Sequence, residues 1–237
     1  MKTDRALKQK AVYVILGYDI NGEKDILGIW INETEGKHTW MQIFDEIKNR
    51  GVQDIGFISM DGVSGLEEGA AAIFPGTVVQ RCIVHLIRNS MRYIPWNKSR
   101  EFLKELKEIY KATNVAEARR LFEKFKGKWA AYPGAIAVWK NNFQHVEQLF
   151  NYGSNVRRVM YTTNAIESIN SSFRKVTRKG SFANDEAILK LLYLRVLELK
   201  NTKWKGKGKV FNWQAVMNQL LIDERMSKLI AKYDWLI

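Results

Sequence analysis

The stretch AVYVILGYDINGEKDILGIWI, residues 11–31, decides the fold class because it contains two apolar runs separated by a turn. The first run, residues 11–18, and the second, residues 25–31, have the length and the β-branched composition of strands. Residues 19–22 between them include Asp, Asn and Gly, which favour a tight turn. We therefore predict a β-hairpin at the start of the fold.

Helical and strand patterns alternate after this hairpin. Apolar residues at helical spacing predict a helix over residues 38–50, and Gly51 is typical of a helix end. We then expect a strand over 54–60, a helix over 64–74, a strand over 77–80 and a helix over 81–93. Such alternation indicates an α/β fold with a mixed sheet.

The second half of the chain has a helical period almost throughout. Residues 99–152 predict an all-helical block, in which Asn114 and Glu117 have the spacing of a capping box and Pro133 is suited to open a further helix. More helices are expected after Asn164, over 185–199 and from residue 212 onward.

Composition excludes several classes of protein. The chain has one cysteine and three scattered histidines, so neither an internal disulfide nor a structural zinc site is expected. We find no apolar run long enough to span a membrane and no secretory leader, and we expect a cytoplasmic protein without a membrane partner.

Positive charge is concentrated in the later part of the chain. Of the net charge of +13, residues 1–80 contribute −4, from 8 basic and 12 acidic side chains, and residues 81–237 contribute +17, from 30 basic and 13 acidic ones. This asymmetry favours a polyanionic partner such as DNA, although a solvated surface kept soluble by its charge would have the same composition. Lysines near Trp204 fit either a base-stacking site or a segment that this tryptophan anchors to the core.

Two carboxylates lie in sequence contexts typical of metal-dependent phosphoryl transfer. Asp61 follows an apolar strand, where α/β sheets place ligands, although Asp-Gly is also a common turn. Glu167 is predicted to share the outer face of its helix with Arg174 and Arg178, although it is also the third residue of a capping box begun by Asn164. The basic neighbours of Glu167 favour a site over a simple cap.

A third motif lies between the two carboxylates. Cys82 and His85 are three residues apart on a predicted helix, and Arg88 and Asn89 follow them. We interpret Cys82, His85 and Asn164 as residues that shape the site.

Together, in this order and with a long helical stretch between them, these motifs resemble the catalytic domain of mutator-type bacterial insertion-sequence transposases, over about residues 10–213. The resemblance implies a ribonuclease H-like fold with a helical insertion and an Asp-Asp-Glu triad, of which Asp61 and Glu167 are two members. It implies Mg²⁺ or Mn²⁺ at the triad, and DNA cleavage and strand transfer at the ends of the insertion element. The terminal inverted repeats and the target DNA would be its partners, and we expect a homo-oligomer. We expect the DNA to contact six basic residues and one amide: Arg88, Asn89, Arg157, Arg158, Arg174, Lys175 and Arg178.

The chain departs from this pattern at its first triad member. No apolar strand with an aspartate precedes residues 11–18, and Asp4 and Asp19 are poorly placed for the role. Loss of this central strand would leave two strands without a hydrogen-bonding neighbour. We therefore expect a truncated transposase with little activity of its own. A DNA-binding regulatory fragment that represses or dimerises, and a ribonuclease H-like nuclease, are the alternatives.

The expected organisation has four parts. Residues 1–97 form the first part of the catalytic domain and 98–155 the helical insertion. Residues 156–200 form the second part of the catalytic domain with the Glu167 helix, and 201–237 a basic linker with a C-terminal helix.

Overall fold

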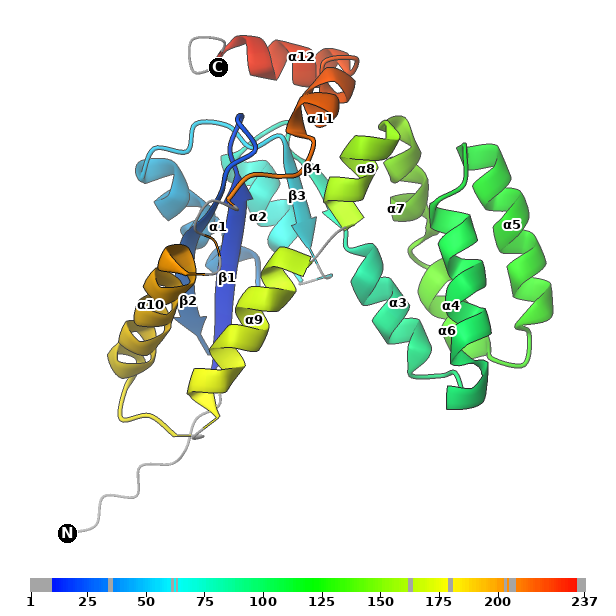
Figure 1. Cartoon of the computed structure of the whole chain (residues 1–237), viewed down its shortest axis with the longest axis horizontal. Helices are drawn as coiled ribbons and strands as arrows, with labels where there is room; N and C mark the ends of the chain where they lie inside the picture. The colour runs from blue at the N-terminus through cyan, green and yellow to red at the C-terminus, as the bar shows by residue number, and fades with distance from the viewer. Residues whose placement is uncertain are drawn as a thin grey trace.

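A computed structural model describes residues 10–33, 36–60, 62, 64–161, 164–178, 181–202, 204 and 208–233, without the side chain of Asn164. Figure 1 shows two halves: a sheet half with four strands and flanking helices, and a helical half beside it. The described residues thus form a mixed α/β structure in which helices predominate.

Four strands form two separate two-stranded sheets within the described residues. β1 (Ala11–Tyr18) pairs antiparallel with β2 (Lys24–Asn32), and a register shift between Ile15 and Leu16 marks an irregularity in the ladder. β3 (Phe57–Met60) pairs in parallel with β4 (Val78–Arg81). The predicted hairpin is therefore confirmed, and its turn is held by Asp19, whose Oδ1 accepts the amide N–H groups of Asn21 and Glu23.

Two helices cover one face of the sheets. α1 (Lys37–Asn49) buries one apolar stripe, and α2 (Leu66–Ile73) packs on it. Tyr13 of β1, Met60 of β3 and Val79 of β4 belong to the same core as these helices. A single hydrophobic layer therefore connects both pairs of strands.

The helical half begins after β4. α3 (Ile83–Met91) leads into α4 (Trp96–Tyr110), α5 (Val115–Lys128), α6 (Pro133–Lys140), α7 (Phe143–Gln148), a 3₁₀ turn (Leu149–Asn151) and α8 (Ser154–Tyr161). The capping box is confirmed in part, because Asn114 Oδ1 accepts the amide N–H of Glu117 at 2.9 Å. α8 runs across residue 155, where we expected the insertion to end.

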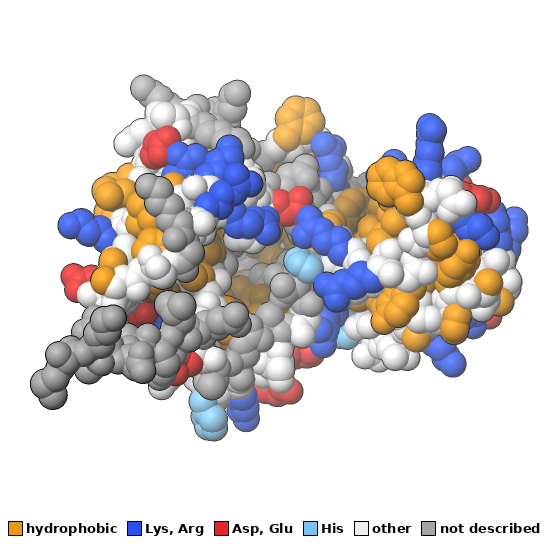
Figure 2. All heavy atoms as spheres, turned by 90° about the horizontal axis from the view of Figure 1, so that it is seen from below, with side chains coloured by type: hydrophobic (Ala, Val, Ile, Leu, Met, Phe, Trp, Pro, Cys, Tyr) orange, Lys and Arg blue, Asp and Glu red, His pale blue; other side chains and the backbone are white. Residues whose placement is uncertain are grey.

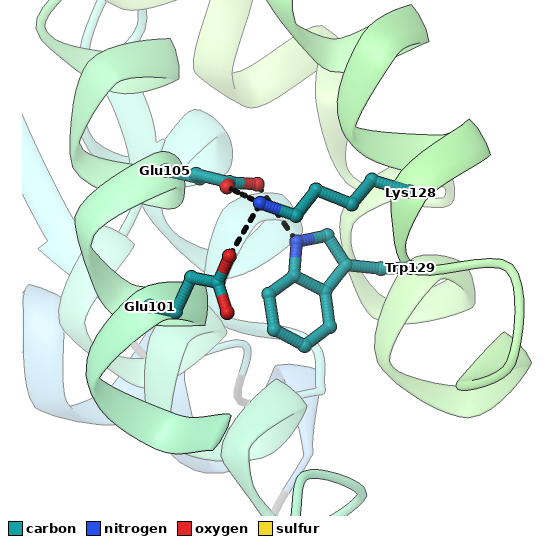
Figure 3. A network of polar contacts seen from close by, with 4 residues as sticks. All are labelled: Glu101, Glu105, Lys128 and Trp129. Atoms are coloured by element: carbon teal, nitrogen blue, oxygen red, sulfur yellow. Dashed lines mark hydrogen bonds and ion pairs between the residues drawn. The ribbon is translucent and has the colours of Figure 1, made fainter.

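Figure 3 shows a polar clamp between α4 and the end of α5. Lys128 pairs with Glu101 at 2.5 Å and with Glu105, and the indole N–H of Trp129 donates to Glu105 at 2.8 Å. The Glu101 and Glu105 carboxylates raise the pKa of Lys128 to about 12.

Two long helices lie against the other face of the hairpin. α9 (Asn164–Thr177) and α10 (Asp185–Asn201) pack together, and their apolar residues form a core with Val14, Leu16 and Ile26 of the hairpin. Figure 1 shows α9 between α10 and the helical half.

The last helices close onto the start of the chain. α11 (Trp213–Leu220) and α12 (Glu224–Ala231) contribute to the core of the helical half. The indole N–H of Trp213 donates to the carbonyl of Ile20 at 2.8 Å, and Arg225 donates to the carbonyls of Gly56 and Gly76. No helix within the described ranges is long and apolar enough to cross a membrane.

Candidate nucleic-acid and metal site

Glu167 lies in the first turn of α9, on the side of that helix opposite the buried Ile169 and Phe173. Its side chain is 35% exposed, and its Oε1 accepts a hydrogen bond from Arg88 Nη2 of α3. The ion pair joins the sheet half to the helical half. The predicted glutamate and the predicted Arg88 are therefore neighbours in space.

Asp61, the other predicted catalytic and metal-binding residue, lies outside the described residues. Its neighbours are well placed: Met60 ends β3, and the Met60 carbonyl accepts the amide N–H of Cys82 at 2.6 Å. Gly62 has a φ of 94°, and a Cβ there would collide with Nη1 of Arg81. A glycine is thus required for the Arg81 guanidinium to rest on this turn.

The Cys82 and His85 pair lies at the start of α3. Cys82 is buried immediately before the first helical residue, and its carbonyl accepts the amide N–H of His85 at 3.1 Å. Through the bond to Met60, Cys82 fixes the start of α3 against the end of β3. Cys82 therefore precedes the helix on which we expected it, and the site-shaping role of Cys82 and His85 stays a prediction.

Basic residues of α9 surround a hollow further along the same helix. Arg174, Lys175 and Arg178 line it together with Ser171 and Thr177, and its volume is about 320 Å³. Figure 2 shows Lys and Arg side chains gathered across the middle of the lower face, between the two halves of the molecule. Three of the predicted DNA contacts therefore come together in one place.

Arg157 and Arg158 of α8, which are also predicted DNA contacts, have partners within the protein. Arg157 donates to the carbonyl of Ala112 at 3.2 Å and its guanidinium lies 4.9 Å from the ring centre of Phe150. Arg158 lies 5.9 Å from the ring centre of Phe211. None of these three contacts was foreseen from the sequence, because each depends on how α8 packs against other segments.

Trp204 is buried, and Lys24 lies 4.7 Å from its ring centre. Of the two roles that the sequence allows for this residue, the structure therefore shows the anchor in the core. Among the lysines around it, Lys203, Lys205 and Lys207 fall outside the described residues. Lys200 forms an ion pair with Asp25, and the backbone of Lys209 forms an isolated antiparallel β-bridge with Glu23.

Few of the described residues could bind a metal ion. Within the described part of the chain no cluster of three or more His, Cys, Asp and Glu side chains could hold a metal ion. Glu167 is the one predicted metal ligand that the structure describes, and it is partly exposed and already faces a cation. A carboxylate that attracts positive charge fits the oxygen ligands that Mg²⁺ prefers.

His145 of α7 lies close enough to Arg81 for the two side chains to interact electrostatically. Burial lowers its pKa, and the positive charge of Arg81 lowers it further. The His145 carbonyl accepts a 2.7 Å hydrogen bond from the buried Gln80 of β4. These contacts join the end of β4 to the helical half.

Sequence reasoning missed Arg81, Tyr93 and Asn141, which line a second hollow described below. A glycine directly after Asp61 was the available signal for Arg81, since glycine often marks the close approach of another group.

Comparison with known proteins bears on this arrangement. Residues 1–206 match the profile of the family described as "Transposase, Mutator family". The chain belongs to the Mutator family of transposases.

Named relatives agree with this assignment. The transposase for insertion sequence element ISRM3 of Rhizobium meliloti (strain 1021) is 43% identical over 202 residues, which cover 84% of this chain and 50% of that protein. A probable transposase for an insertion sequence element of Corynebacterium diphtheriae is 34% identical over 90% of this chain and 68% of its own length. The transposase for insertion sequence element IS256 in transposon Tn4001 of Staphylococcus aureus is 28% identical over 74% of this chain and 45% of its own length. The chain of this Mutator-family protein spans about half the length of the ISRM3 and Tn4001 relatives.

Proposed function

We propose that this chain is the catalytic part of a DNA transposase and that it holds DNA along α9, beside Glu167. The observation that supports this most strongly is that α9 carries the glutamate together with Arg174 and Lys175, and that these two basic residues line one hollow with Arg178, which directly follows the helix. Cations in a row along a helix suit the phosphates of a DNA strand, and the carboxylate near them suits the reacting phosphodiester.

Glu167 and Asp61 would hold the Mg²⁺ or Mn²⁺ ions. The bound metal would activate the attacking hydroxyl and stabilise the leaving oxygen of a phosphodiester. Arg88 has a different role in this proposal: its guanidinium neutralises Glu167 when no metal is bound and can turn to a phosphate when one is. Arg174, Lys175 and Arg178 would position the strand.

We further propose that the strands belong to a ribonuclease H-like sheet. The antiparallel β1–β2 hairpin, a covering helix and the parallel β3–β4 pair follow in the order that such a sheet requires. Within the described residues β1 pairs only with β2 and β3 only with β4, so an edge of each pair is available to a further strand. The shared core of Tyr13, Met60 and Val79 supports one continuous layer.

The partners in this proposal are the terminal inverted repeats of the insertion element and the target DNA, bound by a homo-oligomer. The relatives' names support the link to an insertion element, since each relative is named as a transposase, or probable transposase, for an insertion sequence element.

A DNA-binding assay tests the proposal that α9 holds DNA. We would measure the affinity for a duplex oligonucleotide by fluorescence anisotropy over a range of salt concentrations. Changing Arg174 and Arg178 together to Gln should lower the affinity and reduce the salt slope by about two, because two phosphate contacts are lost.

The matched control changes Lys104 and Lys107 of α4 to Gln, which removes the same charge from exposed positions in the helical half. If both pairs reduce the salt slope equally, α9 has no special role. If the wild-type chain binds no duplex at all, the proposed function fails.

A further inference from the structure

A second hollow lies between α3 and α6, close to the turn after β3. Its volume is about 430 Å³, which is within the range of small-molecule sites. Gly62 and Arg81 lie at its sheet end, and helical residues form the rest of its lining. It is distinct from the basic hollow on α9.

The polar lining consists of amides and one guanidinium. Asn89 of α3 and Asn141 and Asn142 after α6 line the hollow, and a side-chain amide can both donate and accept hydrogen bonds. The amide Nδ2 of Asn142 already donates to the carbonyl of Val138 at 2.8 Å. Nε of Arg81 is buried and makes no hydrogen bond to any described residue. None of the described lining residues is acidic.

The remaining walls are flat and apolar. Leu86 and Val138 contribute aliphatic side chains, and Tyr93 contributes an aromatic ring. Gly134 allows this ring to lie directly on the α6 backbone, because a Cβ at that position would be 2.5 Å from two of the ring carbons. The close contact fixes the Tyr93 ring at the rim of the hollow.

The surroundings are strongly basic. Residues 81–100 include five basic side chains and no acidic one. Arg92 and Lys98, like Arg88, lie in or next to α3 and α4, whose junction includes Tyr93. A nucleic-acid backbone could therefore pass the mouth of the hollow at low electrostatic cost.

We propose that this α3–α6 hollow receives an unpaired nucleobase of the bound DNA. A base has flat faces that suit Tyr93 and the aliphatic walls, and an edge of donors and acceptors that suits the asparagine amides and Arg81. Extrusion of a base from a duplex costs free energy, and less where the base is already unpaired. The hollow would then fix the register of a strand relative to Glu167. This inference rests on the proposed function, since it requires that the chain binds DNA.

The test compares two duplexes that differ by one bulged adenine, each labelled and titrated with the whole chain. We expect the bulged duplex to bind more tightly than the fully paired one. Asn141→Asp should reduce the ratio of the two affinities about tenfold, because a carboxylate cannot donate to the base edge and repels nearby phosphates. Asn97→Asp, an exposed position in the first turn of α4 outside the hollow, is the matched control and should leave the ratio unchanged.

A second pair of variants tests the aromatic wall. Tyr93→Leu should lower the same ratio, and Tyr93→Phe should preserve it, because stacking needs the ring and not the hydroxyl. Equal affinity of the wild-type chain for both duplexes would overturn the inference and leave the proposed function intact, as would a ratio that Asn141→Asp does not change. Absence of binding to either duplex would overturn both.

Discussion

At the scale of single residues, Glu167 and Arg88 form the decisive contact. They lie 79 positions apart in sequence, on α9 and α3, and neither contributes to a hydrophobic core. An exposed ion pair of this kind adds little to stability, because water solvates both partners well when they separate. Its significance is electrostatic: Arg88 occupies a place where the proposed function requires a metal ion.

Removal of Arg88 should therefore improve metal binding. We expect Arg88→Gln to raise the affinity for Mn²⁺ about two- to fivefold, the equivalent of one exposed ion pair that no longer competes. Isothermal titration calorimetry would measure the affinity for Mn²⁺, and Glu167→Gln should abolish Mn²⁺ binding. Arg92→Gln, one helical turn further on, is the control; an equal gain there would mean that overall charge and not the Glu167 contact sets the affinity.

His145 predicts how the stability of the fold depends on pH. Its folded pKa is lowered, first by burial and then by Arg81, so the unfolded chain binds a proton more readily than the folded chain. Stability contributed by neutral His145 is therefore present above its ordinary pKa of about 6.5 and is lost as the pH falls below it. Between about pH 7.5 and about pH 5.5, the melting temperature of the wild-type chain should fall further than that of His145→Gln. Equal falls in a thermal-unfolding series would show that His145 does not contribute.

At the scale of helices and strands, the clamp in Figure 3 shows how one buried donor can matter more than an exposed charge. Glu105 accepts from both Lys128 and the indole N–H of the buried Trp129, whereas Glu101 pairs, among the described residues, with Lys128. The two glutamates are one helical turn apart on α4, and they differ in the Trp129 contact and in the exposure of their side chains, which is 24% for Glu105 and 57% for Glu101.

Glu105→Ala should reduce the free energy of unfolding by about 1–2 kcal/mol, because the Trp129 N–H is left without its acceptor. Glu101→Ala, the matched control, should cost less, because Lys128 keeps the Glu105 carboxylate. Urea denaturation of both variants would measure the difference. Equal losses would mean that the Lys128 ion pairs, and not the indole contact, hold α4 against α5.

Local patterns predicted most of the helices and strands. The hairpin, the strand before Asp61 and the helix after Asn164 were found because apolar period and turn residues are properties of short segments. The parallel β3–β4 pairing and the contacts of Arg157 and Arg158 were not predictable in this way, because they depend on which distant segments meet. Glu167 and the basic residues of α9 could likewise be predicted from their spacing along one helix. The hollow lined by Arg81 and Asn141 could not be predicted from the sequence, because it forms only where separate elements meet in the fold.

At the scale of the whole molecule, the start and the end of the described chain are held together by close packing. Gly22, in the β1–β2 turn, has a φ of 76°, and its carbonyl accepts the amide N–H of Val210 at 2.9 Å. A Cβ at Gly22 would collide with the indole ring of Trp213. This glycine thus has both a backbone and a packing requirement.

Gly22→Ala should destabilise the chain by about 2–4 kcal/mol, which combines backbone strain with overpacking against Trp213. Gly51→Ala is the matched control, because Gly51 also has a positive φ, of 110°, but has open space where the Cβ would lie. It should cost only about 1–2 kcal/mol from backbone strain. Chemical denaturation would compare the free energies of unfolding of the two variants. Equal decreases would show that the Trp213 side chain moves aside without an energetic cost.

The contact between Trp213 and the Ile20 carbonyl spans 193 positions, and this has a consequence during protein synthesis. A ribosome delivers the N-terminal part of a chain first, so the β1–β2 hairpin emerges long before the tryptophan that packs against its turn. Until α9 and α10 emerge, the nascent chain exposes the edges of the hairpin strands and the apolar residues that these two helices later cover. Chaperones that bind such surfaces should therefore associate with this polypeptide for most of its translation and leave as α9, α10 and finally α11 arrive.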